Sequence, residues 1–308
     1  MRFIAAIAAI AEIFVVTGIG GSRVRADPAG APCLSREQLD WSFPELGVAA
    51  DGDRAIVCFR SGAVGEGETC VTVEPVTGKI VGSATWPSKR TPDRPNANTY
   101  KVTVEAKTVV VCGGGTCRRV RDVMPDDPQH ELPLPVVDAR GTQLVLLDSG
   151  ESGVVYDVTS GKARAHFKFP FGDGPPPPGT IHEMEAFGRS ILLGAFSDDG
   201  IWDRAIDPAT GRLVWLMKPY VRLPHDLVAH FDWSGNATLY DFDDHLRVVA
   251  RRAKAGKPRN KGEGVTGDVV VVGDNALIVT RDPPATMFVD SAKRTISKPR
   301  PLLLCPKS

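Results

Sequence analysis

Two short segments contain the side chains that could do chemistry. His182 and Glu183, with Glu185 close behind, follow a run of four prolines, and His225 and Asp226 lie side by side further along the chain. Imidazole and carboxylate groups bind transition metals and transfer protons near neutral pH. We treat His182, Glu183, His225 and Asp226 as candidate binding residues. They match no fixed metal-ligand spacing, so ordinary surface residues on loops are the alternative.

A second candidate is the basic stretch from Arg251 to Lys261, which has six basic residues and no acid until Glu263. It could contact an anionic polymer or lipid. No aromatic residue is interleaved in it to stack on bases, and the whole chain has 37 basic and 37 acidic residues. We therefore expect no nucleic-acid partner. No serine lies in a glycine-flanked nucleophile elbow, and we expect no catalytic residue.

The N-terminus has the composition of a secretory signal. Arg2 is followed by the mostly apolar residues 3–20, and the small residue Ala26 follows Val24 and Arg25. We predict a signal peptide over residues 1–26 and a mature domain over 27–308, with an uncleaved membrane anchor as the alternative. Beyond residue 26 no apolar run approaches about 18 residues. We expect a secreted or periplasmic monomer with no stable membrane insertion after cleavage.

Six cysteines follow the predicted cleavage site, and an even count in an exported chain favours disulfides. Cys112 and Cys117 flank a glycine-rich turn between two short apolar runs, which predicts a cross-strand disulfide in a hairpin. Cys58 and Cys70 repeat this arrangement across a longer loop.

The remaining cysteines are Cys33 and Cys305, near the two mature ends. We predict that they pair and fasten the ends of the chain together. A zinc site is the competing interpretation of Cys112 and Cys117, but no second close cysteine or histidine pair accompanies them. We expect no metal site and no cofactor.

The segments that contain these residues have the sequence pattern of β-strands. Short runs rich in valine, isoleucine and leucine alternate with turns rich in glycine, proline and aspartate. The clearest unit runs from Ala205 to Trp215, as Ala-Ile-Asp-Pro-Ala-Thr-Gly-Arg-Leu-Val-Trp, and weaker copies occupy residues 71–86, 154–167 and 288–296. Aspartate starts the turn, glycine takes its positive φ, and Trp215 is expected to fill the gap between adjacent sheets.

The spacing of the units gives their number. The turn positions Gly78, Gly161, Gly211 and Ala292 are separated by 83, 50 and 81 residues. The two long gaps are each about twice forty, the length of one propeller blade, so each hides a degenerate unit. These are the hairpin around Cys112 and Cys117 and the segment 237–250. Six units result.

The aspartate–threonine–glycine–lysine–tryptophan pattern resembles the repeat of the quinoprotein-like β-propeller superfamily, whose repeats are PQQ-like and WD40-like. The resemblance implies an all-β fold: a single β-propeller of about six four-stranded blades, with seven as the alternative. In that family the pattern is a packing device, so it does not imply the quinone. The cofactor signature of the family's dehydrogenases, including a vicinal cysteine pair, is missing from this sequence.

These observations favour an exported, non-catalytic binding or scaffolding propeller. Its inter-blade loops would contact a protein or small ligand that the sequence does not identify. The alternative is a propeller enzyme, such as a hydrolase, lyase or oxidoreductase, with a metal or acid–base site at His182, Glu183, His225 and Asp226.

Overall fold

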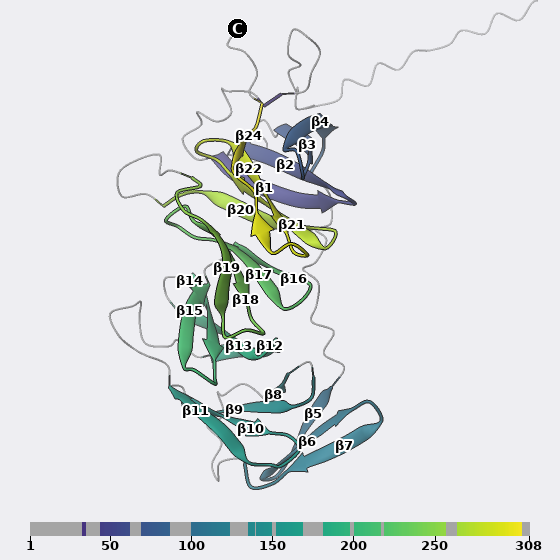
Figure 1. The fold of residues 1–308 in the computed structure, drawn as a ribbon, viewed down its shortest axis with the longest axis vertical. Coiled ribbons are helices and arrows are strands. Elements are labelled where there is room, and N and C mark those ends of the chain that lie inside the picture. The colour runs from purple at the N-terminus through teal and green to yellow at the C-terminus, as the bar shows by residue number, and fades with distance from the viewer. Residues whose placement is uncertain are drawn as a thin grey trace, which may run out of the picture.

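The computed structural model contains strands and turns only (Figure 1). It describes residues 33–34, 44–61, 69–86, 100–123, 135–138, 140–149, 152–168, 181–197, 200–216, 219–256 and 264–303. In this described part of the chain there is no helix of the length and apolarity needed to cross a membrane. The predicted signal peptide lies outside the described residues and stays a prediction.

The strands form six antiparallel sheets, which we number in chain order. Sheet 1 contains β1 (Pro44–Asp51), β2 (Arg54–Ser61), β3 (Thr69–Glu74) and β4 (Lys79–Ala84). Sheet 2 contains β5 (Lys101–Glu105), β6 (Thr108–Gly113) and β7 (Thr116–Val120). Sheet 3 contains β8 (Val136–Val137), β9 (Gln143–Ser149), β10 (Ser152–Asp157) and β11 (Ala163–Lys168).

The C-terminal half follows the same plan. Sheet 4 contains β12 (Ile181–Phe187), β13 (Ser190–Ser197), β14 (Gly200–Asp207) and β15 (Arg212–Leu216). Sheet 5 contains β16 (Tyr220–Leu223), β17 (Leu227–Phe231), β18 (Ala237–Asp241) and β19 (Arg247–Arg252). Sheet 6 contains β20 (Gly267–Val272), β21 (Asn275–Thr280), β22 (Ala285–Asp290) and β23 (Thr295–Ile296), and β24 (Arg300–Pro301) also pairs with β22.

The six sheets confirm the all-β, propeller-type fold, and each contains one of the six predicted units. The two degenerate units are hairpins, as predicted: β6–β7 carries Cys112 and Cys117, and β18–β19 spans the second gap. Sheet 2 has three strands within the described residues.

The core is a series of apolar layers between neighbouring sheets. Strand β9 shows how this arises from the sequence, because Leu144 and Leu146 pack towards sheet 2 while Val145 and Leu147 pack towards sheet 4. Alternate residues of a strand point to opposite faces, so a sheet held between two others needs an unbroken apolar run. Similar layers join sheets 4 and 5, sheets 5 and 6, and sheets 6 and 1.

The sheets follow one another in a column in which sheet 1 packs beyond sheet 6 (Figure 1). Strand β1 lies against β20, and the Leu34 N–H donates to the carbonyl of Leu303 over 3.0 Å. Segments from the two ends of the chain are therefore joined. Sheets 1 and 2 stand at opposite ends of the column in this view.

Antiparallel strands place successive turns at alternate ends of each sheet. In sheets 3 to 6 the first and third turns meet on one side, which we call the turn face: residues 140–142, 158–162, 188–189, 208–211, 224–226, 242–246, 273–274 and 291–294. The opposite side, which we call the loop face, includes residues 232–236, 253–256, 264–266 and 281–284 of sheets 5 and 6.

Candidate functional site

An acidic residue ends the third strand of most sheets and holds the turn that follows. The Asp157 carboxylate accepts the Ser160 N–H at 2.7 Å and the Ser160 hydroxyl at 2.9 Å. These hydrogen bonds hold the pKa of Asp157 below its usual range. Glu74 does the same with Thr77, and Asp290 with Lys293, and the pKa of each carboxyl is likewise lowered. The predicted role of this position in the repeat is therefore present in the structure.

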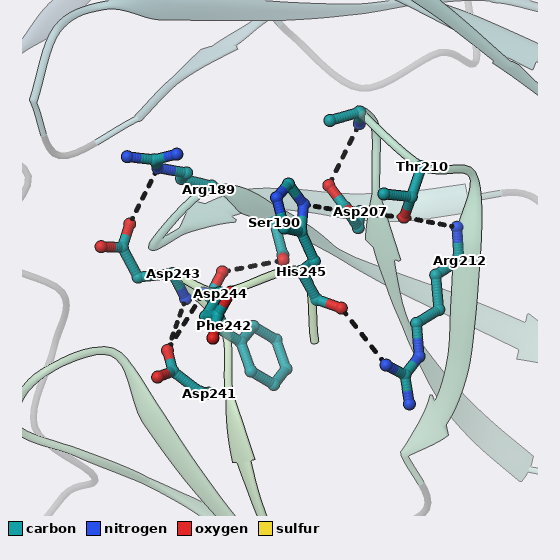
Figure 2. Close-up of polar contacts among 11 residues, drawn as sticks. Arg189, Ser190, Asp207, Thr210, Arg212, Asp241, Phe242, Asp243, Asp244 and His245 are labelled. Carbon is teal, nitrogen blue, oxygen red and sulfur yellow. Dashed lines mark hydrogen bonds and ion pairs between the residues drawn. The ribbon is translucent and has the colours of Figure 1, made fainter. Parts of the chain in front are cut away.

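Asp207, the aspartate of the clearest unit, also joins two sheets (Figure 2). Its buried carboxylate accepts the Ala209 N–H at 3.1 Å and the Thr210 hydroxyl. The Nδ1 atom of His245, from the β18–β19 turn of sheet 5, lies 2.8 Å from the same carboxylate. One side chain thus fixes its own turn and anchors the turn of the next sheet.

Asp241 repeats this arrangement one sheet further on. Its carboxylate accepts the N–H groups of Asp243 and Asp244 at 3.0 and 3.1 Å, and the Arg294 guanidinium of sheet 6 donates to it over 2.7 Å. The turn after β18 is therefore held from both sides. We call the charged residues that link the turns of sheets 3 to 6 the turn-face cluster: Arg140, Arg189, Asp207, Asp241, Asp243, His245 and Arg294.

Three sheets meet at Asp243. Arg140 of sheet 3 lies 2.6 Å from one carboxylate oxygen, and Arg189 of sheet 4 lies 3.4 Å from the other. The Ser190 hydroxyl, beside Arg189, donates to the Phe242 carbonyl at 3.0 Å (Figure 2). The aspartate raises the pKa of the Arg140 guanidinium through their hydrogen bond. These charges neutralise one another and fasten the turns together.

The predicted site residues His225 and Asp226 lie on the turn face, in the turn between β16 and β17. Both have a positive φ, 63° and 55°, which is uncommon for residues other than glycine. The Asp226 carbonyl accepts the Phe242 N–H at 2.9 Å. Burial raises the pKa of the Asp226 carboxyl, and the nearby Asp243 raises it further.

The other two predicted residues, His182 and Glu183, lie at the opposite end of sheet 4. They stand near the start of β12, where a β-bulge separates Ile181 from Glu183, whereas β12 reaches the turn face only at its other end. The structure thus does not bring the two predicted pairs to a common rim. Glu185 forms a bidentate ion pair with Arg222 of β16, at 2.5 and 2.7 Å, and this pair bridges sheets 4 and 5.

Both hairpin disulfides are present. Cys58 pairs with Cys70 and Cys112 with Cys117, each at directly opposed positions of neighbouring strands. Cys33 is disulfide-bonded as well. Cys305 lies outside the described residues, so the Cys33–Cys305 pairing stays a prediction. The backbone hydrogen bond from Leu34 to Leu303 supports it, because Leu34 follows Cys33 directly and Leu303 precedes Cys305 by two residues.

The chemical capacity of the turn-face cluster is limited by its own contacts. Its most buried carboxylates, Asp207 and Asp241, are occupied by turn N–H groups and by a cation from the next sheet. Among the described residues, no group of three or more histidine, cysteine or acidic side chains has a geometry suited to a metal ion. The cluster therefore fits a structural brace better than a reaction centre.

Two features escaped the sequence patterns. Arg204 is buried, and its guanidinium lies 4.2 Å from the ring centre of Trp215, the half-buried tryptophan expected between sheets. Burial lowers the pKa of Arg204. The second feature is Trp233, which is 62% exposed on the loop face. Periodicity could not reveal either one, because each depends on what a neighbouring strand or turn leaves uncovered.

The fold and site define a chain of the β-propeller class. Solved structures similar to it include the β-propeller domain of Cps50 (Swd1) from Myceliophteria thermophila, at 12% identity and a TM-score of 0.30 with 64% of each chain covered. The chain thus spans less than two thirds of that domain. The RRP9 WD40 repeats match at 10% identity and a TM-score of 0.32, covering 92% of this chain and 87% of theirs.

BamB from Moraxella catarrhalis matches at 14% identity and a TM-score of 0.27, covering 83% of this chain and 76% of that one. No protein-family model matches the sequence, and no curated protein matches it.

Proposed function

We propose that this protein is an exported, non-catalytic binding or scaffolding propeller that contacts its partner through the loop face. The single observation that supports this most is the contrast between the two faces. The charged side chains of the turn face hold one another in place, whereas the loop face presents the large, exposed Trp233 on an ordered turn. A rigid scaffold with an exposed aromatic side chain is typical of a recognition surface.

Export is part of the proposal. The apolar N-terminal segment and the disulfides of sheets 1 and 2 support an oxidising compartment, outside the cell or in a periplasm. Intact-mass analysis of protein from a secreting host should give a chain beginning at Asp27. A chain that retains residues 1–26 would contradict cleavage.

Site-specific photocrosslinking in cells that make the protein tests the choice of face. A crosslinking residue at Ser234 on the loop face is compared with one at Ala209 on the turn face; both positions are exposed. We expect an adduct with another macromolecule from position 234 and none from position 209. Adducts only from position 209, or from neither position, would refute binding through the loop face.

One observation favours an enzyme as the second candidate. A carboxyl with a raised pKa beside another acid is typical of acid–base sites, and Asp226 beside Asp243 meets this description. His225 and Arg140 complete the polar surroundings of Asp226. Elemental analysis of purified wild type and of the double variant His225→Ala, Asp226→Asn separates the candidates. A stoichiometric metal that the double variant loses would favour the enzyme.

A further inference from the structure

The loop face of sheet 5 carries one large apolar side chain beside several cations. Trp233 lies in the turn between β17 and β18 and is 62% exposed. Arg251 and Arg252 end β19, which pairs with β18, and Lys254 follows in the next turn; all three are exposed. We call Trp233, Arg251 and Lys254 the Trp233 surface.

The backbone that presents Trp233 is held firmly. The Asp232 carboxylate accepts the Asn236 N–H at 2.9 Å, and the Gly235 N–H donates to the Asp232 carbonyl, also at 2.9 Å. The Trp233 carbonyl accepts the Val265 N–H at 2.9 Å, which ties the turn to the segment leading into sheet 6. An ordered turn loses little conformational entropy when a partner covers its side chain.

The same contacts bring Lys254 beside the turn, and Arg251 lies opposite Thr238, two residues beyond the turn on β18. The Ala255 N–H donates to the Gly235 carbonyl at 2.7 Å, and the Lys254 N–H donates to the Asn236 side chain at 3.3 Å. Asp232 is the acid of this turn, and the Asn236 amide hydrogen-bonds both of its carboxylate oxygens. Arg252 is partly engaged, because its Nε donates to the Ile296 carbonyl at 2.9 Å. Arg251 and Lys254 are therefore the cations best able to meet an anionic partner.

We infer that the Trp233 surface binds an acidic segment of a partner protein. An apolar side chain of that segment would cover the indole, and its carboxylates would face Arg251 and Lys254. Tryptophan and arginine are enriched in protein-interface hot spots, and the charges of Arg251 and Lys254 complement an acidic segment. This inference rests on the proposed binding function and gives the partner its chemistry.

Other anionic partners fit less well. Nonspecific binding of single-stranded nucleic acid uses a row of aromatic rings for successive bases, and the described part of this turn offers one ring. A lipid surface needs more apolar insertion than one side chain supplies. Of the other large exposed apolar residues of the described chain, Val76, Val81 and Val104 belong to sheets 1 and 2, and Val248 lies near the turn-face end of β19.

Fluorescence anisotropy with a labelled random copolymer of glutamate and tyrosine tests the inference on the full mature protein. We expect Trp233→Ala to weaken binding at least about tenfold, the loss typical of a hot-spot residue. The double reversal Arg251→Glu, Lys254→Glu should weaken binding by a similar factor at low salt and by less at high salt. Circular dichroism establishes that each variant is folded.

The matched control reverses the same number of charges elsewhere. Lys101→Glu with Arg121→Glu alters two exposed residues of sheet 2, at the far end of the column, and should leave the affinity unchanged. The inference is overturned if the wild type does not bind the copolymer, or if both surface variants bind it as well as the wild type. It is also overturned if phosphatidylglycerol vesicles or oligothymidylate bind in a Trp233-dependent way and the copolymer does not.

The crosslinking experiment shows which proposal has failed. A partner that still crosslinks at position 234 in the Trp233→Ala and charge-reversal variants would leave loop-face binding standing and refute the Trp233 surface. If the otherwise wild-type protein forms no adduct from the loop face, the proposed function itself is refuted.

Discussion

On both the turn face and the loop face an aspartate holds its own turn through hydrogen bonds, but the two turns serve different purposes. On the turn face Asp207 holds its own turn and also receives His245 from the next sheet. On the loop face Asp232 holds its turn through Asn236, but the neighbouring tryptophan points to the surface. Both turns are rigid, and they differ in what they present. Rigidity alone therefore does not mark a binding surface, whereas an exposed side chain on a rigid turn does.

The largest expected effect tests the structural role of the turn face. Asp207→Ala leaves the Ala209 N–H, the Thr210 hydroxyl and the His245 ring without their shared buried acceptor. Loss of three hydrogen bonds, each with a net value of about 0.5–1.5 kcal/mol, should cost about 2–4 kcal/mol of the free energy of unfolding. Urea denaturation of variant and wild type measures the loss. Asp207→Asn retains one acceptor oxygen and should lose less, and a loss below about 1 kcal/mol for the alanine variant would mean that Asp207 is not a brace.

The second test concerns the β6–β7 hairpin of sheet 2, whose turn contains no acidic residue. In sheet 2 the β6–β7 hairpin has the Cys112–Cys117 disulfide where other sheets have a carboxylate. Replacing both cysteines by serine should cost about 2 kcal/mol, the chain-entropy value for so short a loop. Thermal unfolding with and without reductant measures it. If reductant destabilises the double variant as much as the wild type, the effect arises at another disulfide.

How far the sequence predicted these features depends on the range of the interaction. The turns were predictable because aspartate, glycine and cysteine act within a few residues of their own position, and the spacing of Gly78, Gly161 and Gly211 counted the sheets. The site was not. His182 lies near the start of the first strand of sheet 4, whereas His225 lies in the turn after the first strand of sheet 5, so the two histidines stand at opposite ends of their sheets. The exposure of Trp233 likewise depends on how segments distant in the sequence pack around its turn.

A smaller effect tests the link between sheets 4 and 5. His245→Ala removes the contact of 2.8 Å with Asp207 but leaves the Asp207 hydrogen bonds within its own turn intact. We expect a loss of about 1 kcal/mol, the usual net value of one hydrogen bond. A double-mutant cycle with Asp207→Asn gives the coupling between the two residues. Strict additivity would show that the contact does not stabilise the fold.

Asp226 differs from His245 because removing its charge should stabilise the folded protein. Its pKa is raised above the ordinary value of 3.8, chiefly by burial and then by Asp243, so the folded protein holds this proton more tightly than the unfolded chain does. Stability is therefore lost as pH rises from 3.8 through the folded-state pKa, and the whole cost is present above that pKa. Asp226→Asn should raise the melting temperature by about 1–3 °C at pH 7.

The pH dependence separates this cause from a packing effect. Below the ordinary aspartate pKa the wild-type carboxyl is protonated and neutral like the amide, so the two melting temperatures should converge. A stabilisation that is the same at acidic and neutral pH would indicate a packing change. A destabilised variant at pH 7 would show that the Asp226 charge stabilises the fold, as its attraction to Arg140 would require.

The smallest expected change in stability belongs to the residue with the largest expected change in binding. Trp233→Ala removes a side chain that is mostly in solvent and leaves the Asp232, Gly235 and Val265 backbone contacts in place, so the free energy of unfolding should change by less than about 0.5 kcal/mol. Trp215→Ala is the matched control, because it removes the same side chain from a half-buried position against the Arg204 guanidinium and should cost about 2–4 kcal/mol. Urea denaturation of both variants, read beside the copolymer affinity, distinguishes a binding residue from a core residue. If Trp233→Ala destabilises the protein as much as Trp215→Ala, its indole is part of the packing between sheets 5 and 6, and the two faces differ less than their exposed surfaces indicate.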